Sequence, residues 1–269
     1  MAVIDYTPND IVIVGYPKSG NTWLTRLVGE LVGCPVVGFI GQHGNEVAIE
    51  GLSRKSSYRC FKSHHTIDEL NSLGVSIRKV IYIVRDPRDV CLSGASYFKI
   101  SKFYLPKLVQ NSLPLNPRRK RQFFDYLNHK YPATLTRSID RMAHAIVRGD
   151  QSINWFVRSP WREHYMQYSS AACFFIKFED LLDQPISCSV DMLKYLGVSK
   201  SLSHIASSVQ RQSFAVKRQQ FLLAGDYQRA DFMRAGIKEQ WRDRLPSSTK
   251  SLLDNVLSED LRRLSYPLT

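Results

Sequence analysis

The sequence IVIVGYPKSGNT, residues 11–22, decides the fold of this chain. Its first four residues are β-branched, which is typical of a strand buried on both faces. A loop follows from Gly15 to Thr22. A helical pattern comes next and ends at Gly33, with apolar residues at Leu24, Leu27, Val28, Leu31 and Val32. Because a strand, a glycine-bearing loop and a helix form the phosphate-binding unit of α/β proteins, this stretch predicts such a unit.

Further strands and helices are predicted along the chain. Short apolar segments at 58–62, 80–84 and 173–178 predict three more strands. Helices are predicted from Asp86-Pro87 towards Tyr97, from Pro185 to Gly197, and over the apolar-periodic stretch that begins at Ser247. Strands separated by helices favour an α/β fold with a P-loop-type, mostly parallel sheet and helices on both faces. Because we find no linker or repeat, we predict a single domain over residues 1–269.

The composition is that of an ordinary globular protein. Hydrophobic residues make up 43% and charged residues 23% of the 269 residues, which excludes a disordered or fibrous chain. The 37 lysines and arginines exceed the 24 acidic residues, so the formal net charge is +13. This charge favours an anionic partner, such as a nucleotide, a sulfated or phosphorylated substrate, nucleic acid or an acidic membrane surface.

The sequence predicts neither a leader nor a membrane span. The first ten residues lack the basic and apolar regions of a signal peptide, and the longest uncharged stretch, residues 31–45, is short and interrupted by Pro35. The five cysteines are widely spaced and form no C-x-x-C motif, which indicates reduced thiols. We therefore expect a cytoplasmic protein without a transmembrane segment.

The loop departs from the ATP-binding P-loop at one position. Gly15 and Gly20 have the G-x-x-x-x-G spacing, but Asn21 stands where that motif has its lysine, and the loop's lysine is Lys18. Thr22 still supplies a hydroxyl. Backbone amides and the following helix N-terminus predict an anion site, in which the relocated lysine meets a different atom of the ligand.

Three motifs along the chain carry a family resemblance. The loop from Tyr16 to Trp23 reads YPKSGNTW, residues 62–64 read KSH, and residues 85–89 read RDPRD, with Ser93 eight residues after the arginine. On these residues the chain resembles the cytosolic sulfotransferase superfamily, whose members use 3′-phosphoadenosine-5′-phosphosulfate (PAPS). The family has a YPKSGTTW-like loop, a K-T-H element and this arginine–serine signature in the same order. Looser matches continue to Trp241, so the resemblance covers most of the chain.

The chain also departs from the family pattern. Phe178 replaces the tyrosine of the Y-E-D-L element, Gln212 replaces a threonine before the S-F pair, and Ala235 replaces the lysine of an R-K-G element. The family's short C-terminal dimer motif is absent, so dimerisation by that route is not expected and the oligomeric state stays open.

The resemblance implies roles for these residues. Lys18 would neutralise charge on the oxygen that leaves sulfur, and Ser19, Gly20, Asn21 and Thr22 would bind the 5′-phosphate. Arg85 and Ser93 would bind the 3′-phosphate, and Arg234 and Gly236 would close over it. Trp23 and Phe214 are candidates to pack the adenine, with ordinary core packing as the alternative. The product would be 3′,5′-diphosphoadenosine (PAP), and no metal is expected, because protein cations suffice for a sulfuryl group.

The acceptor's proton would go to His64. The family's K-T-H element matches Lys62-Ser63-His64, so Lys62 would face the sulfuryl oxygens and His64 would be the base. In an extended segment residues i and i+2 share a face, so we expect His65 to point away from both.

Two alternatives and one question stay open. A P-loop nucleotide kinase or hydrolase would need a lysine at position 21 and Mg²⁺ ligands. A basic nucleic-acid-binding protein is supported by charge alone, and the cluster Arg118-Arg119-Lys120-Arg121 is better explained as a solvated face. We expect no nucleic-acid partner, and an acceptor that is a small molecule, a glycan or a lipid, with residues 99–150 and 215–233 lining its pocket.

Overall fold

The computed structural model describes all residues except 1–5, 42–46, 74–78 and 233–235. The described residues form two compact units. The first comprises residues 1–15, 20–84 and 168–238, and the second comprises residues 16–19, 85–167 and 239–269. Among the described residues, no helix combines the length and the apolar character that a bilayer span requires.

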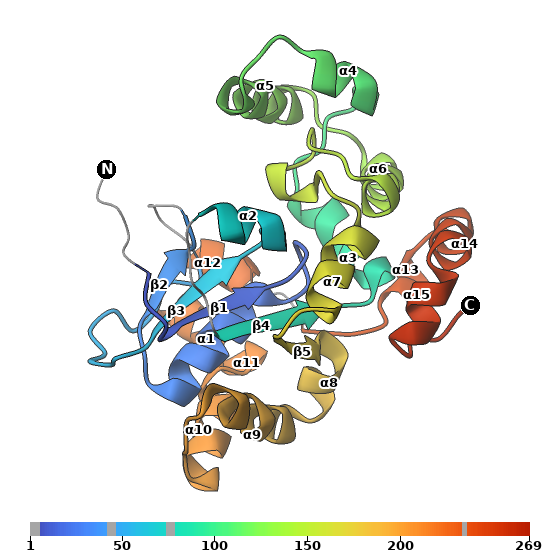
Figure 1. The fold of residues 1–269 in the computed structure, drawn as a ribbon. Coiled ribbons are helices and arrows are strands. Elements are labelled where there is room, and N and C mark those ends of the chain that lie inside the picture. The colour runs from blue at the N-terminus through green and yellow to red at the C-terminus, as the bar shows by residue number, and fades with distance from the viewer. Residues whose placement is uncertain (1–5, 42–46, 74–78, 233–235) are drawn as a thin grey trace. The chain divides into compact units, whose positions relative to one another are not determined.

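The first unit is built on a five-stranded sheet (Figure 1). The strands are β1 (Asp10–Val14), β2 (Val36–Phe39), β3 (Arg59–Ser63), β4 (Lys79–Val84) and β5 (Phe174–Lys177). Their order is β2-β3-β1-β4-β5, and every pairing is parallel. The predicted α/β fold with a mostly parallel sheet is therefore confirmed, and the three further strands agree with their predicted bounds within one residue.

The core of the first unit lies between the sheet and the helices that cover it. All five residues of β1 are buried, among them the four of the apolar run 11–14 that predicts a strand buried on both faces. Helix α1 (Asn21–Val32) packs on β1 and β3 and also contacts α9 (Pro185–Leu196), which lies on the same side of the sheet (Figure 1). Both helices end at a glycine in the left-handed region, Gly33 and Gly197, as predicted.

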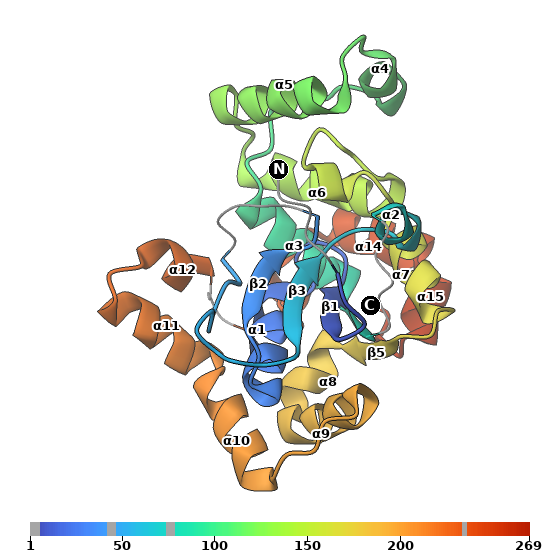
Figure 2. The same ribbon diagram turned by 60° about the vertical axis from the view of Figure 1, so that its left-hand side comes forward.

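Further helices complete the first unit. They are α2 (Ile67–Ser72), α8 (Phe178–Asp183), α10 (Leu202–Arg211), α11 (Phe214–Leu223) and α12 (Tyr227–Phe232). Figure 2 shows α10 and α11 following each other along the chain beyond α9. Helix α10 packs on both α1 and α9, so the helical layer is continuous.

The second unit is helical. Its helices are α3 (Pro87–Tyr97), α4 (Lys107–Ser112), α5 (Pro117–Lys130), α6 (Leu135–Arg148), most of α7 (Trp161–Ser169), α13 (Trp241–Arg244), α14 (Ser247–Val256) and α15 (Ser258–Arg263), with a 3-10 turn at Trp155–Val157. Helix α3 begins where Pro87 predicts, and the Asp86 side chain caps it by accepting a hydrogen bond from the Arg88 N–H at 2.9 Å.

One helix and one strand differ from the sequence prediction. The apolar periodicity from Ser247 continues through Leu264, but the chain forms two helices that separate at Leu257. A second helix starts there because Glu259 and Asp260 stand in its first turn, where acidic side chains are favourable. Strand β2 was not predicted, since it has only four residues and contains Gly38.

Candidate active site

The loop after β1 holds its backbone in an unusual conformation. Lys18 and Gly20 have φ angles of 73° and 103°, both in the left-handed region, and the Ser19 N–H donates to the Tyr16 carbonyl at 3.1 Å. A non-glycine residue pays about 1–2 kcal/mol for this conformation. Strain of this kind persists at functional sites, where successive amide groups form a concave binding surface for anions.

Gly20 starts helix α1 and cannot carry a larger side chain. It occupies the N-cap position, and having no side chain it leaves the first N–H groups of α1 without a side-chain cap. A Cβ at this position would lie 2.6 Å from Cδ2 of Phe178. The helix N-terminus therefore keeps its donors available for an anion.

Asn21 ties the loop to the sheet. Its Nδ2 donates to the Gly15 carbonyl at 3.2 Å and to the Ser63 carbonyl, at the end of β3, at 3.0 Å. The position that carries the lysine of an ATP-binding P-loop thus holds a structural amide. Thr22, in the first turn of α1, is buried.

His64 follows the end of β3 and contacts the same loop. Its Nδ1 lies 2.7 Å from the Gly15 carbonyl oxygen. Because a carbonyl oxygen only accepts, Nδ1 carries the proton, and the neutral ring then has its lone pair on Nε2. This hydrogen bond fixes the tautomer that a general base needs.

Lys62 and His65 flank His64. Lys62 is buried in β3, beside Ile13 of β1 in the sheet register. His65 contacts the Ser63 hydroxyl through Nδ1 at 3.0 Å, and its carbonyl accepts a hydrogen bond from Tyr168. The prediction that Lys62 and His64 share a face and that His65 points away assumes an extended strand, but β3 ends at Ser63. The centroid of the Phe39 ring lies 5.6 Å from that of His64 and 5.5 Å from that of His65.

Three of the predicted cofactor-binding residues meet in the first unit. The Trp23 and Phe214 rings lie 4.8 Å apart, and Trp23 Nε1 donates to the Gln212 carbonyl at 2.9 Å. A Cβ on Gly236, whose φ is +55°, would lie 2.2 Å from Cδ2 of Phe214. Trp23 also packs edge-on against Phe178. The structure thus places Trp23 inside an aromatic cluster, where only 7% of its surface is exposed.

Three further predicted residues, Lys18, Arg85 and Ser93, belong to the second unit. The Lys18 ammonium lies 3.4 Å from the centroid of the Tyr97 ring, a cation–π contact. The Lys18 carbonyl accepts a hydrogen bond from Arg85 Nη1 at 3.3 Å. Ser93 lies two turns along α3, on the same helix as Tyr97. Arg234 lies outside the described residues.

Arg85 is also paired with a buried carboxylate. Its Nη2 lies 3.7 Å from Asp89 Oδ2, and the Asp89 oxygens accept hydrogen bonds from the N–H groups of Glu239 at 2.7 Å and Trp241 at 3.1 Å. Burial raises the pKa of Asp89, and the Arg85 guanidinium opposes that increase. Asp89 therefore connects the arginine to the chain segment before α13.

Sequence reasoning missed Asp89, Tyr97 and Phe39 as neighbours of the candidate residues. Each contact is made across the fold, except that Asp89 stands four residues after Arg85, a helical spacing that suits an ion pair. That spacing was the one local signal available.

The loop fits an anionic group. Among the described residues, Ser19 Oγ and Asn21 Oδ1 are buried side-chain atoms without a hydrogen-bond partner. The strained backbone, the uncapped helix N-terminus and a lysine inside the loop supply donors and positive charge, which suit a phosphate ester. Within the same described residues, no cluster of three or more histidine, cysteine or acidic side chains could hold a metal ion.

Comparisons with known proteins all point to one family. A family model described as "Sulfotransferase domain" matches residues 8–265. Human Sulfotransferase 2A1 is 35% identical over 104 residues, a match that covers 35% of this chain and 36% of that protein. Rat Sulfotransferase 2B1 is 24% identical, and the match covers 96% of this chain and 73% of the relative.

Solved structures share the fold. A mouse sulfotransferase crystallised with PAP aligns with a TM-score of 0.64 at 19% identity, covering 96% of this chain and 86% of that one. A retinol dehydratase in complex with androsterone and PAP aligns with a TM-score of 0.60 at 15% identity, covering 96% and 82% of the two chains. At these identities the likeness establishes a common fold.

Proposed function

The chain belongs to the sulfotransferase family, and from that membership we propose that it moves a sulfuryl group from PAPS to a hydroxyl or amine acceptor by in-line displacement. Residues 1–269 would act as one sulfotransferase domain. The alternative of a P-loop kinase or hydrolase has no support, because Asn21 uses its side chain to bind two backbone carbonyls where such enzymes need a lysine.

The conformation of the loop is the observation that carries this proposal. Lys18, with its positive φ, precedes a glycine N-cap by two residues, so a cation and a set of backbone donors come from one short segment. PAPS supplies an activated sulfuryl group on a phosphate. Ser19, Gly20, Asn21 and Thr22 would bind the 5′-phosphate through backbone amides, and Lys18 would neutralise charge on the leaving oxygen.

Further residues would recognise the rest of the nucleotide. Arg85 and Ser93 would bind the 3′-phosphate, for which the planar guanidinium of Arg85 is well suited. Arg234 and Gly236 would add to that contact. Trp23 and Phe214 would pack the adenine, and because their rings lie 4.8 Å apart the base would lie against this pair and not between its rings.

His64 would accept the proton of the acceptor. Its Nδ1 donates to the Gly15 carbonyl, so Nε2 is the basic atom of the neutral ring. Lys62, two residues earlier, would stabilise negative charge on the sulfuryl oxygens. The loop and the base are held together, since the Gly15 carbonyl accepts hydrogen bonds from both Asn21 and His64.

The acceptor class and the location complete the proposal. We assign the acceptor to small molecules, glycans or lipids that carry a hydroxyl or amine. A cytoplasmic location is supported by the five cysteines, which are free thiols, and by the relative named Cytosolic sulfotransferase 13 from Arabidopsis thaliana, 23% identical over 94% of this chain.

Ligand-induced thermal stabilisation tests the proposal. At 100 times its dissociation constant, PAP raises the free energy of unfolding by about 2.7 kcal/mol. ATP with Mg²⁺ at the same concentration is the matched control and should stabilise less. A library of phenols, alcohols, amines and sugars, screened with PAPS for PAP release, then identifies the acceptor. Stabilisation by ATP with Mg²⁺ but none by PAP would contradict the proposal.

A further inference from the structure

Much of the chain's positive charge lies in one short region of the second unit. Residues 99–130 hold eight lysines and arginines against one aspartate, a net +7 out of the chain's +13. The cluster Arg118-Arg119-Lys120-Arg121 at the start of α5 belongs to it. The roles proposed above for PAPS binding and for proton transfer use none of these cations, so their charge needs a separate explanation.

Helices α4 and α5 are poorly covered by the rest of their unit. Among the described side chains of α5, a helix of 14 residues, only Phe124 and Asn128 are buried. By contrast α6, of the same length, buries seven residues. Figures 1 and 2 both show α4 next to α5, and Lys120 Nζ on α5 donates to the Asn111 carbonyl on α4 at 2.9 Å.

The same segment of the chain exposes large apolar side chains. Leu108 on α4 is 81% exposed and Tyr104, just before it, is 60% exposed. The α4–α5 surface is defined here by its exposed apolar residues and its exposed arginines: Phe103, Tyr104, Leu108, Val109, Phe123, Tyr126, Arg118, Arg119 and Arg121. A monomer seldom exposes so many large apolar residues in one region, unless that region binds a partner.

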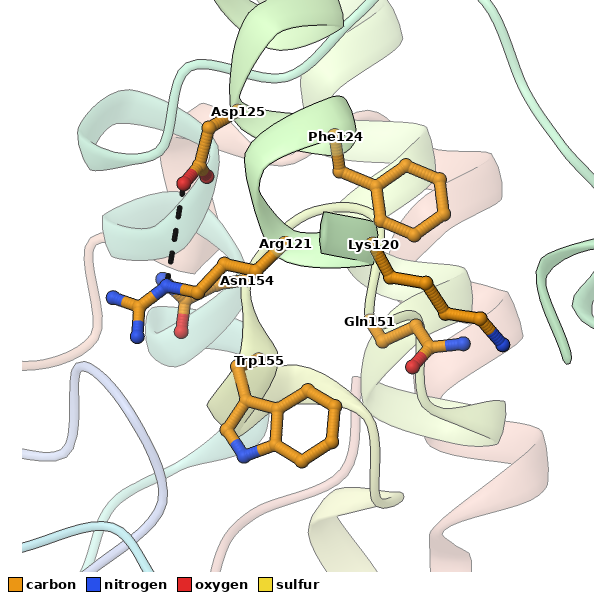
Figure 3. A pocket seen from close by; sticks show the side chains of 7 residues that line it. All are labelled: Lys120, Arg121, Phe124, Asp125, Gln151, Asn154 and Trp155. Carbon is orange, nitrogen blue, oxygen red and sulfur yellow. Dashed lines mark ion pairs between the residues drawn. The ribbon is translucent and has the colours of Figure 1, made fainter. Parts of the chain in front are cut away.

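A small pocket adjoins this surface (Figure 3). Phe124 and Trp155 contribute its aromatic rings, and Lys120 and Arg121 contribute cations. Arg121 pairs with Asp125 at 4.0 Å, but both side chains are more than half exposed, so the pair is weak and the arginine can exchange partners. The pocket therefore places positive charge next to aromatic rings at the edge of this surface.

From these observations we propose that the α4–α5 surface docks the protein onto a membrane that contains anionic lipid. Lysines and arginines are attracted to the negative surface potential, while leucine, phenylalanine and tyrosine enter the boundary between headgroups and acyl chains. Nucleic acid would use the cations and stack bases on the exposed aromatic rings, but it gains little from Leu108 and Val109, whose aliphatic side chains neither stack on bases nor bind phosphates. The combination of both features on one surface favours lipid.

Vesicle co-sedimentation of the full chain tests this docking. We expect binding to phosphatidylcholine vesicles that contain about 30% phosphatidylserine, at least tenfold stronger than binding to pure phosphatidylcholine, and weakening as salt rises above about 0.1 M. Each cation near such a surface strengthens binding about fivefold, so the double variant Arg118→Gln/Arg119→Gln should bind about 25-fold more weakly.

Matched control variants test whether vesicle binding depends on the α4–α5 surface or on net charge and exposed apolar residues anywhere on the protein. The control Arg262→Gln/Arg263→Gln removes two neighbouring exposed arginines from α15 and should bind as the wild type does. Leu108→Ser should lose about tenfold in binding. Leu223→Ser, at a residue that is 82% exposed on α11, should not. Thermal unfolding of each variant should match the wild type, because all of these side chains are exposed.

Several outcomes would overturn the docking proposal. One is equal binding to vesicles with and without phosphatidylserine. Another is an equal loss of vesicle binding in variants of the α4–α5 surface and in the control variants. A third is binding of duplex oligonucleotides without binding of vesicles. PAP stabilisation is measured on the same variants and should be unchanged. The docking proposal and the sulfotransferase proposal can therefore fail separately.

Discussion

Replacing His64 with asparagine separates the two tasks that the structure gives to this side chain. The His64 Nδ1 donates to the Gly15 carbonyl at 2.7 Å, and Nε2 would accept the acceptor's proton. The amide nitrogen of asparagine is attached at the same position as Nδ1, so it can donate to the same carbonyl. Asparagine offers no basic nitrogen. We therefore expect His64→Asn to keep the loop and lose the chemistry.

The size of each effect follows from the contacts. Loss of a general base lowers kcat by about 10²–10⁴, or about 2.7–5.4 kcal/mol in the barrier. The free energy of unfolding should stay within about 1 kcal/mol of the wild type in His64→Asn. His64→Ala should cost about 1 kcal/mol, near the low end for a lost hydrogen bond, because the Gly15 carbonyl still accepts from Asn21.

Turnover from pH 5 to pH 9 with one acceptor, measured beside urea unfolding, provides the assay. The wild-type rate should fall at acidic pH, where the imidazole is protonated and has no lone pair to accept a proton, whereas the residual rate of His64→Asn should lack this fall. His65→Asn is the matched control and should keep both rate and profile. A rate for His64→Asn within tenfold of wild type, or inactivity confined to His65→Asn, refutes the assignment of the base.

Three further predictions concern the loop and the nucleotide. Lys18→Met should lower kcat by about 10²–10³ without a change in thermal unfolding, and a rate near that of wild type would remove Lys18 from the mechanism. Arg85→Ala should weaken PAP binding by about 1.5–3 kcal/mol and Ser93→Ala by about 0.5–1.5 kcal/mol. Calorimetry should show little effect of either change on adenosine 5′-phosphosulfate, and equal losses for both nucleotides would contradict a 3′-phosphate contact. Asn21→Ala should lower the free energy of unfolding by about 1–3 kcal/mol in urea, because two buried hydrogen bonds are lost; Asn21→Asp, which keeps the shape but loses the donor, should be at least as damaging.

Features carried by local sequence signals could be predicted. The β-branched run 11–14 predicted a buried strand, and Pro87 and Gly197 marked the start of α3 and the end of α9. In each case a backbone preference of a single residue, or of four consecutive ones, is enough to determine the local conformation. The family motifs likewise lie in short segments, which made the sulfotransferase resemblance visible.

Features that depend on tertiary contact could not be predicted. Phe39 reaches the His64 ring because β2 lies beside β3, and β2 itself is too short to be recognised from its residues. The hydrogen bond from Asn21 Nδ2 to the Ser63 carbonyl joins residues that are 42 positions apart in the sequence. The contact of Lys18 with Tyr97 requires α3 to fold back to the loop, and no periodicity contains that information.

The φ angle of 73° at Lys18 has a consequence for protein engineering. Glycine adopts this angle without steric penalty, so Lys18→Gly relieves about 1–2 kcal/mol of strain, against about 0.5–1 kcal/mol lost with the cation–π contact to Tyr97, while deleting the ammonium group. A library selected for heat resistance alone should therefore enrich glycine at position 18, and the enriched clones should be better folded and inactive. Directed evolution of this chain for stability needs a simultaneous screen for turnover, or a library in which codon 18 is held constant.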